Sequence, residues 1–307
     1  MGIDTMTLEF LLDARKNGVK FKDTITLGRQ DLLVEYRDIE NLFYLYGISF
    51  TDRTIIEFYR KSNQFAEPLL EYLGAKTCKS IDYSDFEGAS IVHDLNNPIN
   101  YEFKGQFDTV IDGGTLEHVF NFPQAIKNCM ELVKVGGHFI SITPTNNYLG
   151  HGFYQFSPEL LYRIFSEENG FKVKKMIYCE QNRDNLWYEV LDPKVISHRA
   201  EAMSMYHCSL MLLAEKIKNT NIFEKIPQQS DYADEWTHKP DKGNSIDRLN
   251  FWGGNTTSSK KGLLAIIKML LKQPFKRIKE FLFKKLILQP KGLLPDKNYF
   301  VPYKKPR

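Results

Sequence analysis

Residues 106–114 read QFDTVIDGG, and residues 138–144 read HFISITP. Both are short apolar runs with β-branched residues, a pattern typical of strands buried on two faces. The intervening segment PQAIKNCMELVK (123–134) has apolar residues on one helical side, and the glycines at 136–137 follow it as a stop signal. A strand, a helix and a strand in this order predict a β-α-β unit with parallel strands.

The same alternation continues on both sides of this unit. Further strands are predicted at 23–34, 78–84, 89–96, 171–180 and 206–217. Helices are predicted at 62–75 and 157–170, and apolar residues at helical spacing predict an insertion of helices over about 36–73. The fold class is therefore α/β, with a doubly wound, mainly parallel, seven-stranded Rossmann-like sheet.

Charge divides the chain into a body and a tail. The 307 residues carry a formal charge of +3, but residues 260–307 hold 14 basic and two acidic residues, leaving 27 basic and 36 acidic residues in 1–259. We predict an α/β domain over 1–217, an irregular excursion or linker over 218–259, and a basic amphipathic tail over 260–307. The acidic body disfavours nucleic acid as a partner, because phosphate backbones attract basic surfaces.

Residues 260–289 have the pattern of an amphipathic helix at a membrane interface. Apolar residues share one face of the second half, and its lysines lie mostly elsewhere. Such a helix binds anionic lipid through its lysines and buries its apolar face at the headgroup boundary. Packing on the acidic body or on a second protomer, and binding to nucleic acid, are the alternatives.

Cysteine usage and targeting signals indicate a cytoplasmic protein, with peripheral attachment to the inner membrane face as an extension. The four cysteines lie far apart without a C-x-x-C pair, which is typical of thiols in a reducing compartment. The first residues lack the pattern of a signal peptide, and no run of about 18 apolar residues is present.

Polar residues gather where the predicted strands end. Gly28 follows the first strand, Asp82 and Asp94 end the next two, and Asp112 precedes Gly113 at the end of another. Ligands of open parallel sheets bind outside these carboxyl ends. Any one of these acids could equally be a loop or helix cap, so the series is more informative than its members.

The ordered set of motifs over 107–171 resembles the small-molecule branch of the class I S-adenosylmethionine-dependent methyltransferases. The set is FDTVIDGGTLEHV, an amphipathic helix, LVKVGGHFISITP, GHGFYQFSPELLYRIF and NGF. The resemblance extends over about residues 23–217 and implies S-adenosyl-L-methionine as cofactor.

The resemblance assigns roles to the strand-end residues. Asp82 matches the acid that accepts both ribose hydroxyls, and a carboxylate suits two neighbouring hydroxyls. Asp94, with the backbone of Leu95, matches the position that holds the adenine amino group. Asp112 and Gly113 match the wall beside the methionine part.

The glycine-rich loop departs from the family pattern. After the first strand this chain has LGRQD (27–31), so Gly28 alone stands where the family has a run of glycines that meets the methionine carboxylate and ammonium. The resemblance therefore leaves two readings of the site: a working cofactor site or a remodelled one.

His118 and His151 are the candidate catalytic bases, since a hydroxyl acceptor must lose a proton on methylation. Each could instead be a capping or hydrogen-bonded loop histidine. Tyr154 and Phe156 could line an acceptor pocket or pack against the following helix. His93 is more typical of a structural residue, and the spacing reveals no metal triad.

These residues favour methyl transfer to a small or lipid-linked acceptor, such as a sugar hydroxyl in surface-glycan biosynthesis. The first alternative is an inactive methyltransferase-fold binding or scaffold module of a membrane-associated glycan assembly. A dehydrogenase ranks last because the chain lacks G-x-G-x-x-G.

Overall fold

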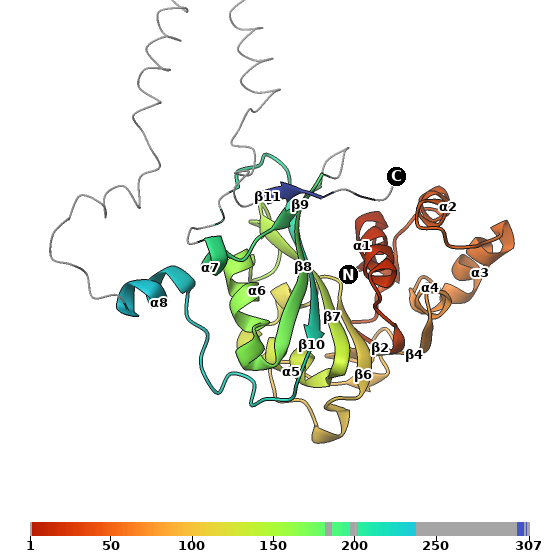
Figure 1. Ribbon diagram of the computed structural model, residues 1–307. Helices are drawn as coiled ribbons and strands as arrows, with labels where there is room; N and C mark the ends of the chain where they lie inside the picture. The colour runs from red at the N-terminus through yellow and green to blue at the C-terminus, as the bar shows by residue number, and fades with distance from the viewer. Residues whose placement is uncertain are drawn as a thin grey trace, which may run out of the picture.

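The computed structural model describes residues 2–181, 186–196, 200, 202–237, 300–303 and 305. Within these ranges a central sheet of nine strands has the order β11-β9-β8-β10-β7-β6-β2-β4-β5 (Figure 1). Its parallel part consists of β2 (Lys22–Leu27), β4 (Ala75–Asp82), β5 (Ile91–Val92), β6 (Phe107–Asp112) and β7 (Val133–Asn146). The fold is thus α/β with a mixed sheet, in which the five neighbouring strands from β7 to β5 are parallel.

The other half of the sheet is antiparallel. Strand β10 (Cys208–Lys216) lies between β7 and β8 (Phe171–Glu180) and runs against both. Strands β9 (Trp187–Val190) and β11 (Phe300–Pro302) extend the edge beyond β8. The prediction of seven strands is therefore two short, because these edge strands of four and three residues are too short to show a hydrophobic period.

The predicted strand 23–34 is wrong in its second half. Strand β2 ends at Leu27, where Gly28 has a φ of +67° and turns the chain away from the sheet. Strand β3 (Asp31–Leu32) then pairs with β1 (Gly2–Ile3) in a separate two-stranded sheet. A turn with one glycine inside an apolar run thus separates two short strands that the pattern merged.

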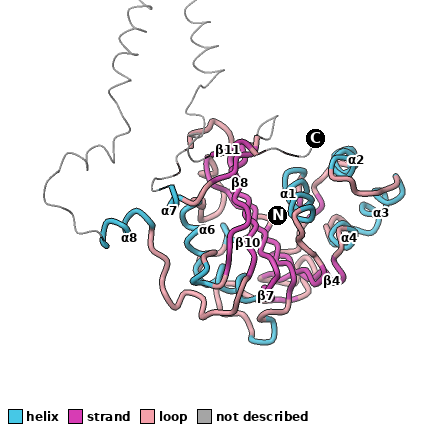
Figure 2. Tube along the Cα trace, viewed as in Figure 1, coloured by secondary structure: helices cyan, strands magenta, loops and turns pink. Residues whose placement is uncertain are grey.

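Helices cover both faces of the central sheet, as Figure 2 shows. One face carries α5 (Phe122–Leu132) and α6 (Pro158–Ile164), both close to their predicted positions. The other carries α1 (Thr5–Lys16) and the inserted helices α2 (Tyr36–Leu45), α3 (Asp52–Ser62) and α4 (Glu67–Tyr72). The remaining helical segments are η1 (Tyr101–Phe103), η2 (Leu116–His118), η3 (Glu167–Asn169), α7 (Pro193–Ile196) and α8 (Ser230–Thr237).

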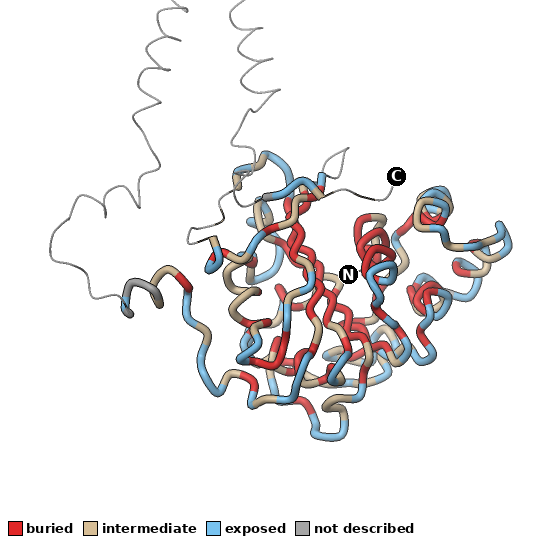
Figure 3. The backbone as a smooth tube through the Cα atoms, in the orientation of Figure 1, coloured by how far each residue is buried: buried red, intermediate tan, exposed pale blue. Residues whose placement is uncertain are grey.

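Helix α1 has no counterpart among the predicted elements, and its burial explains why. Nine consecutive residues from Met6 to Ala14 are buried, so the helix has no long polar face to reveal its period. Its N-cap is Asp4, whose side chain accepts a hydrogen bond from the Thr7 amide (2.7 Å). Figure 3 shows this buried helix beside the sheet.

The inserted helices are fixed by local caps and by a shared core. Thr51 and Thr54 form a reciprocal capping box at the start of α3. The aromatic rings of Phe43, Phe58 and Tyr72 meet at centroid distances of 5.2–6.2 Å and join α2, α3 and α4. This side of the molecule shares its core with α1 and with the sheet residues Ile111 and Ile140.

The last described residues return to the body. Tyr303 Oη donates to Asp13 Oδ1 on α1 (2.5 Å) and accepts from Lys175 Nζ (2.6 Å). Lys305 Nζ contacts Glu9 Oε2 (2.7 Å). Part of the predicted tail therefore packs on the α/β domain, whereas residues 260–289, predicted to bind a membrane, lie outside the described residues. No helix in the described ranges is long and apolar enough to span a membrane.

Candidate functional site

The strand order places the candidate site at the carboxyl ends of β2 and β6. The chain winds outward from β2 through β4 to β5 in one direction, and from β6 to β7 in the other. Leu27 lies in register with Asp112, and Asp82 with Val92, so the strands end at one edge. Such a reversal of strand order is called the topological switch point, and ligands of open α/β sheets bind there. The predicted residues Gly28, Asp82 and Asp112 are thus brought together.

Asp112 is fully buried and organises the loop that follows β6. Its carboxylate accepts hydrogen bonds from the amide of Thr115 (2.8 Å) and from Ser141 Oγ (2.7 Å), and a longer one from the amide of Leu116 (3.4 Å). Burial raises the pKa of Asp112, and these donors oppose the rise by stabilising the carboxylate. The side chain therefore holds the loop, and Gly113 is left to present backbone.

The loop after β2 replaces glycines with a buried glutamine. Gln30 Nε2 donates to the Leu27 carbonyl (2.5 Å), and its side chain is 2% exposed. In the described ranges Gln30 Oε1 has no hydrogen-bond partner. A Cβ on Gly113 would collide with this oxygen, so the two residues are matched across the switch point. The sequence analysis did not assign Gln30 a role, because a single glutamine carries no motif.

Arg29 bridges the loops after β2 and β4. Its Nε contacts Glu67 Oε1 (2.6 Å), and Nη1 donates to the Glu87 carbonyl (2.7 Å). The guanidinium also lies 3.9 Å from the ring centroid of Phe65. These three contacts together hold the Arg29 side chain across the β2–β4 side of the site.

Asp82 and Asp94 differ in the number of hydrogen bonds that they accept from their own loops. Asp82 Oδ1 accepts from the Tyr83 amide (2.6 Å) and is partly exposed at the end of β4. Asp94 accepts from the Asn96 amide and side chain and from the Asn97 side chain (2.7–3.1 Å), which lowers its pKa. Leu95 is buried and its carbonyl accepts from Asn128 Nδ2 (3.0 Å). Asp82 has the carboxylate more available to a ligand.

A second group of polar residues lies beyond β6 and β7. Glu117 and His118 are adjacent in η2, and His151 belongs to the loop after β7. The His118 and His151 rings meet edge to face with centroids 4.8 Å apart, and His151 Nε2 lies 3.6 Å from Glu117 Oε1. The two predicted bases are therefore neighbours, and Glu117 joins them.

Burial separates Glu117 from the two histidines. The Glu117 side chain is 2% exposed, whereas His118 and His151 are exposed. Burial, followed by the nearby Asp112, raises the pKa of Glu117. Partial desolvation of the His118 ring, followed by the nearby His151, lowers the pKa of His118, which favours the neutral imidazole.

Backbone contacts press the loop after β7 against Glu117. The Glu117 carbonyl accepts from the amides of Phe153 (2.7 Å) and Tyr154 (3.3 Å). Gly152 has a φ of +68°, and a Cβ there would lie 2.8 Å from the same carbonyl oxygen. Only glycine fits this approach, so the GHGF segment is needed to bring His151 to Glu117.

The neighbouring aromatic residues have structural contacts. Phe156 is buried and packs on Phe122 at a centroid distance of 4.7 Å, just before the α6 N-cap Ser157. Tyr154 Oη donates to the Phe120 carbonyl (2.6 Å). His93 Nε2 lies within hydrogen-bond distance of the Asn97 carbonyl (3.1 Å). Phe156 thus belongs to the core, where the contact described is with α5.

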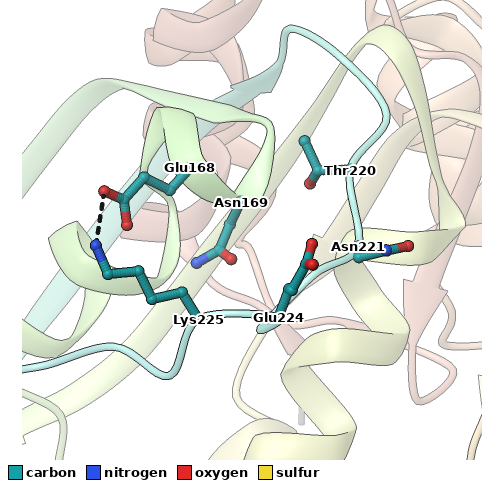
Figure 4. A pocket seen from close by; sticks show the side chains of 6 residues that line it. All are labelled: Glu168, Asn169, Thr220, Asn221, Glu224 and Lys225. Atoms are coloured by element: carbon teal, nitrogen blue, oxygen red, sulfur yellow. Dashed lines mark ion pairs between the residues drawn. The ribbon is translucent and has the colours of Figure 1, made fainter.

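A polar cavity lies at the opposite end of the sheet (Figure 4). It is lined by Glu168, Asn169, Thr220, Asn221, Glu224 and Lys225. These residues precede β8 and follow β10, so they lie near the amino ends of the parallel strands. The ion pair that crosses it, Lys225 with Glu168 (3.6 Å), has two exposed side chains. The cavity is therefore not part of the site at the switch point.

Comparison of the sequence with protein-family models and with curated proteins finds no match. Among solved structures, the chain is similar to an rRNA methylase from Streptococcus thermophilus (9% identity, 69% of this chain, 97% of that one, TM-score 0.32). It is also similar to TehB from Haemophilus influenzae (14%, 67% and 61%, TM-score 0.35).

A third similar structure is the C9 mutein of the branched-chain polyamine synthase from Thermus thermophilus, in complex with N4-aminopropylspermidine and 5′-methylthioadenosine. It is 10% identical over 71% of this chain and 56% of that one, with a TM-score of 0.35. These likenesses are distant, and the proposals below rest on the geometry of the site and on the sequence motifs.

Proposed function

We propose that this protein transfers a methyl group from S-adenosyl-L-methionine to a small or lipid-linked acceptor, such as a sugar hydroxyl in surface-glycan biosynthesis. The observation that carries the proposal is the set of residues at the switch point. Asp82, Gly113 and Gln30 Oε1, which has no partner among the described residues, lie at one edge of the sheet, where the resemblance to class I methyltransferases implies the cofactor.

The residues present fit the two ends of the cofactor in different ways. Asp82 is the acceptor proposed for the ribose hydroxyls, and Asp94 with Leu95 is proposed to hold the adenine. At the methionine end, Gln30 Oε1 is a buried acceptor without a partner in the described part of the chain. An ammonium group would satisfy it, since a buried unpaired acceptor costs about 1–3 kcal/mol.

The methyl donor supplies an electrophilic methyl group, and the protein must supply orientation and proton removal. His118 and His151 are the proposed bases for a hydroxyl acceptor. His118 suits the role because its lowered pKa favours the neutral form that can accept a proton. Both rings are exposed at the sheet edge, where an acceptor can approach.

The acceptor class depends on the basic segment. Residues 260–289 are proposed to bind an anionic membrane and so bring the site to a lipid-linked acceptor. Sedimentation with anionic vesicles tests this part, with K276E, R277E, K284E and K285E combined in one variant. Loss of vesicle binding is expected, and equal binding by both proteins would remove the membrane from the proposal.

One observation favours the alternative of an inactive scaffold module. Arg29 crosses from the β2 loop to the β4 loop and is held there by Glu67, the Glu87 carbonyl and Phe65. If this bridge is permanent, it closes the β2–β4 side against a cofactor, and the fold would then serve as a binding module.

Calorimetric titration with S-adenosylhomocysteine separates the two functions. If the protein is a methyltransferase, we expect it to bind S-adenosylhomocysteine with micromolar affinity. This binding should weaken at least about tenfold in D82N, because the ribose hydroxyls lose a charged acceptor. D85N is the matched control, since Asp85 is exposed on the same loop. Absence of binding at high protein concentration, with the protein folded, would exclude the enzyme and favour the scaffold.

A further inference from the structure

Glu117, His118 and His151 form a cluster of side chains that could do more than accept a proton from a substrate. One potential ligand atom of each residue lies within 4.8 Å of the other two. Two imidazole nitrogens and one carboxylate oxygen are a donor set for divalent first-row transition metals such as Zn²⁺ and Fe²⁺. We propose that these three residues form a binding site for such an ion.

The state of Glu117 is a second observation that points to a cation. Its side chain is 2% exposed, and Oε2 has no hydrogen-bond partner in the parts of the chain that the structure describes. Its other oxygen, Oε1, lies 3.6 Å from His151 Nε2. Buried carboxylates are normally paired or bound to a metal. A metal ion bound by both oxygens of this carboxylate would also satisfy Oε2, for which the described residues supply no partner.

The backbone holds the cluster in place. Glu117 and His118 are adjacent, and Asp112 fixes the start of their loop through the Thr115 and Leu116 amides. The amides of Phe153 and Tyr154 bind the Glu117 carbonyl, which fixes His151 beside them. The scaffold is therefore built on both neighbouring loops, and neither histidine depends on a long flexible segment to reach the glutamate.

The geometry requires a small adjustment and leaves coordination positions open. Ligands at 2.0–2.2 Å from Zn²⁺ lie about 3.3–3.6 Å from one another in a tetrahedral site, closer than the 4.8 Å limit here. Rotation of the exposed His118 and His151 side chains can close the gap over the buried Glu117. Three protein ligands at a solvent-exposed site leave at least one position for water or an acceptor oxygen.

The site changes the chemistry expected of the two histidines. Ligation uses the nitrogen that would otherwise accept a proton, so the ion and not a free imidazole would lower the pKa of a bound hydroxyl. This consequence rests on the proposed function, but binding of the ion itself does not. Titration with S-adenosylhomocysteine probes Asp82, so either proposal can fail alone.

The experiment is titration of the untagged, EDTA-treated full chain with Zn²⁺ by calorimetry and with Co²⁺ by absorption. We expect one ion per chain in this cluster and a Co²⁺ spectrum typical of nitrogen and oxygen ligands. E117Q, H118N and H151N should each weaken binding at least about tenfold, since each removes one of three ligands.

Controls identify the cluster as the source of the signal. H138Q is the matched control, because His138 is part-buried near the amino end of the β7 segment that pairs with β6, away from the cluster. It should bind as the unchanged protein does. E117Q keeps the size of the side chain, and circular dichroism verifies that it folds. Binding unchanged in a variant that combines E117Q, H118N and H151N, or no binding up to about 1 mM ion, would overturn the proposal.

Discussion

The polar side chains on the two sides of the switch point differ in their contacts and in their exposure. On the β2–β4 side, Arg29 pairs with Glu67 and crosses to Glu87, and Gln30 fills the space against Gly113. On the β6–β7 side, exposed His118 and His151 lie over a buried Glu117. On the first side Arg29 and Gln30 make polar contacts within the protein beside a partly exposed Asp82, and on the second side both histidines are exposed to a ligand.

This comparison separates stability from chemistry. Substitutions of Arg29, Glu67 and Gln30, which close the β2–β4 side, and of the shared Asp112 should mainly change the free energy of unfolding. Substitutions of the two exposed histidines should leave it nearly unchanged and affect ligands.

D112A should have the largest effect, because Asp112 supports both sides. The change leaves the Thr115 amide and Ser141 Oγ without their buried acceptor. We expect a loss of about 3 kcal/mol or more in the free energy of unfolding, measured by urea denaturation. S141A removes only one donor and should cost about 1 kcal/mol. Equal losses in the two variants would contradict this assignment.

G113A tests the match between Gly113 and Gln30. The added Cβ would meet Gln30 Oε1, and moving that side chain breaks its bond to the Leu27 carbonyl. We expect a loss of about 1–2 kcal/mol. In a Q30A background the same change should cost less than about 0.5 kcal/mol. A cost that persists in this background would place the strain in the backbone instead.

A double-mutant cycle of R29Q and E67Q measures the bridge on the β2–β4 side. Both side chains are about a quarter exposed, at 28% and 25%, so we expect a coupling energy of about 1 kcal/mol or less. The coupling should fall in 1 M salt because an exposed ion pair is screened. If R29Q also tightens S-adenosylhomocysteine binding, the bridge competes with the ligand.

H118A and H151A should have the smallest effect on stability. Both histidines are exposed, and we expect changes within about 0.5 kcal/mol by urea denaturation. The same variants should lose metal affinity, which a stability measurement does not report. A loss above about 1 kcal/mol in either variant would show that these residues hold the loop together, contrary to the comparison.

Much of the fold was predictable from short-range pattern. The β-α-β unit from β6 to β7 follows from hydrophobic period and glycine stops, which depend only on neighbouring residues. Helix α1 and strand β11 were not predictable in this way. The first is buried over nearly its whole length, and the second pairs with β9 from more than a hundred residues away.

The candidate site likewise contains residues that were predictable from short-range pattern and contacts that were not. Acids after predicted strands identified Asp82, Asp94 and Asp112, because parallel strands of one sheet end at one edge. The partners of these residues could not be predicted. Nothing in the order of the chain says that Asp112 binds Ser141, or that Gln30 meets Gly113.

The α/β class could be predicted from the sequence alone, and so could the candidate acids at strand ends and the two candidate histidines, since each depends on local pattern or on a strand end. Only the tertiary structure placed His151 beside Glu117, 34 positions earlier, and buried that glutamate without a partner for Oε2 among the described residues. The reason is physical: burial and ligand geometry are properties of the loops that meet, and the spacing of residues along one loop does not encode them.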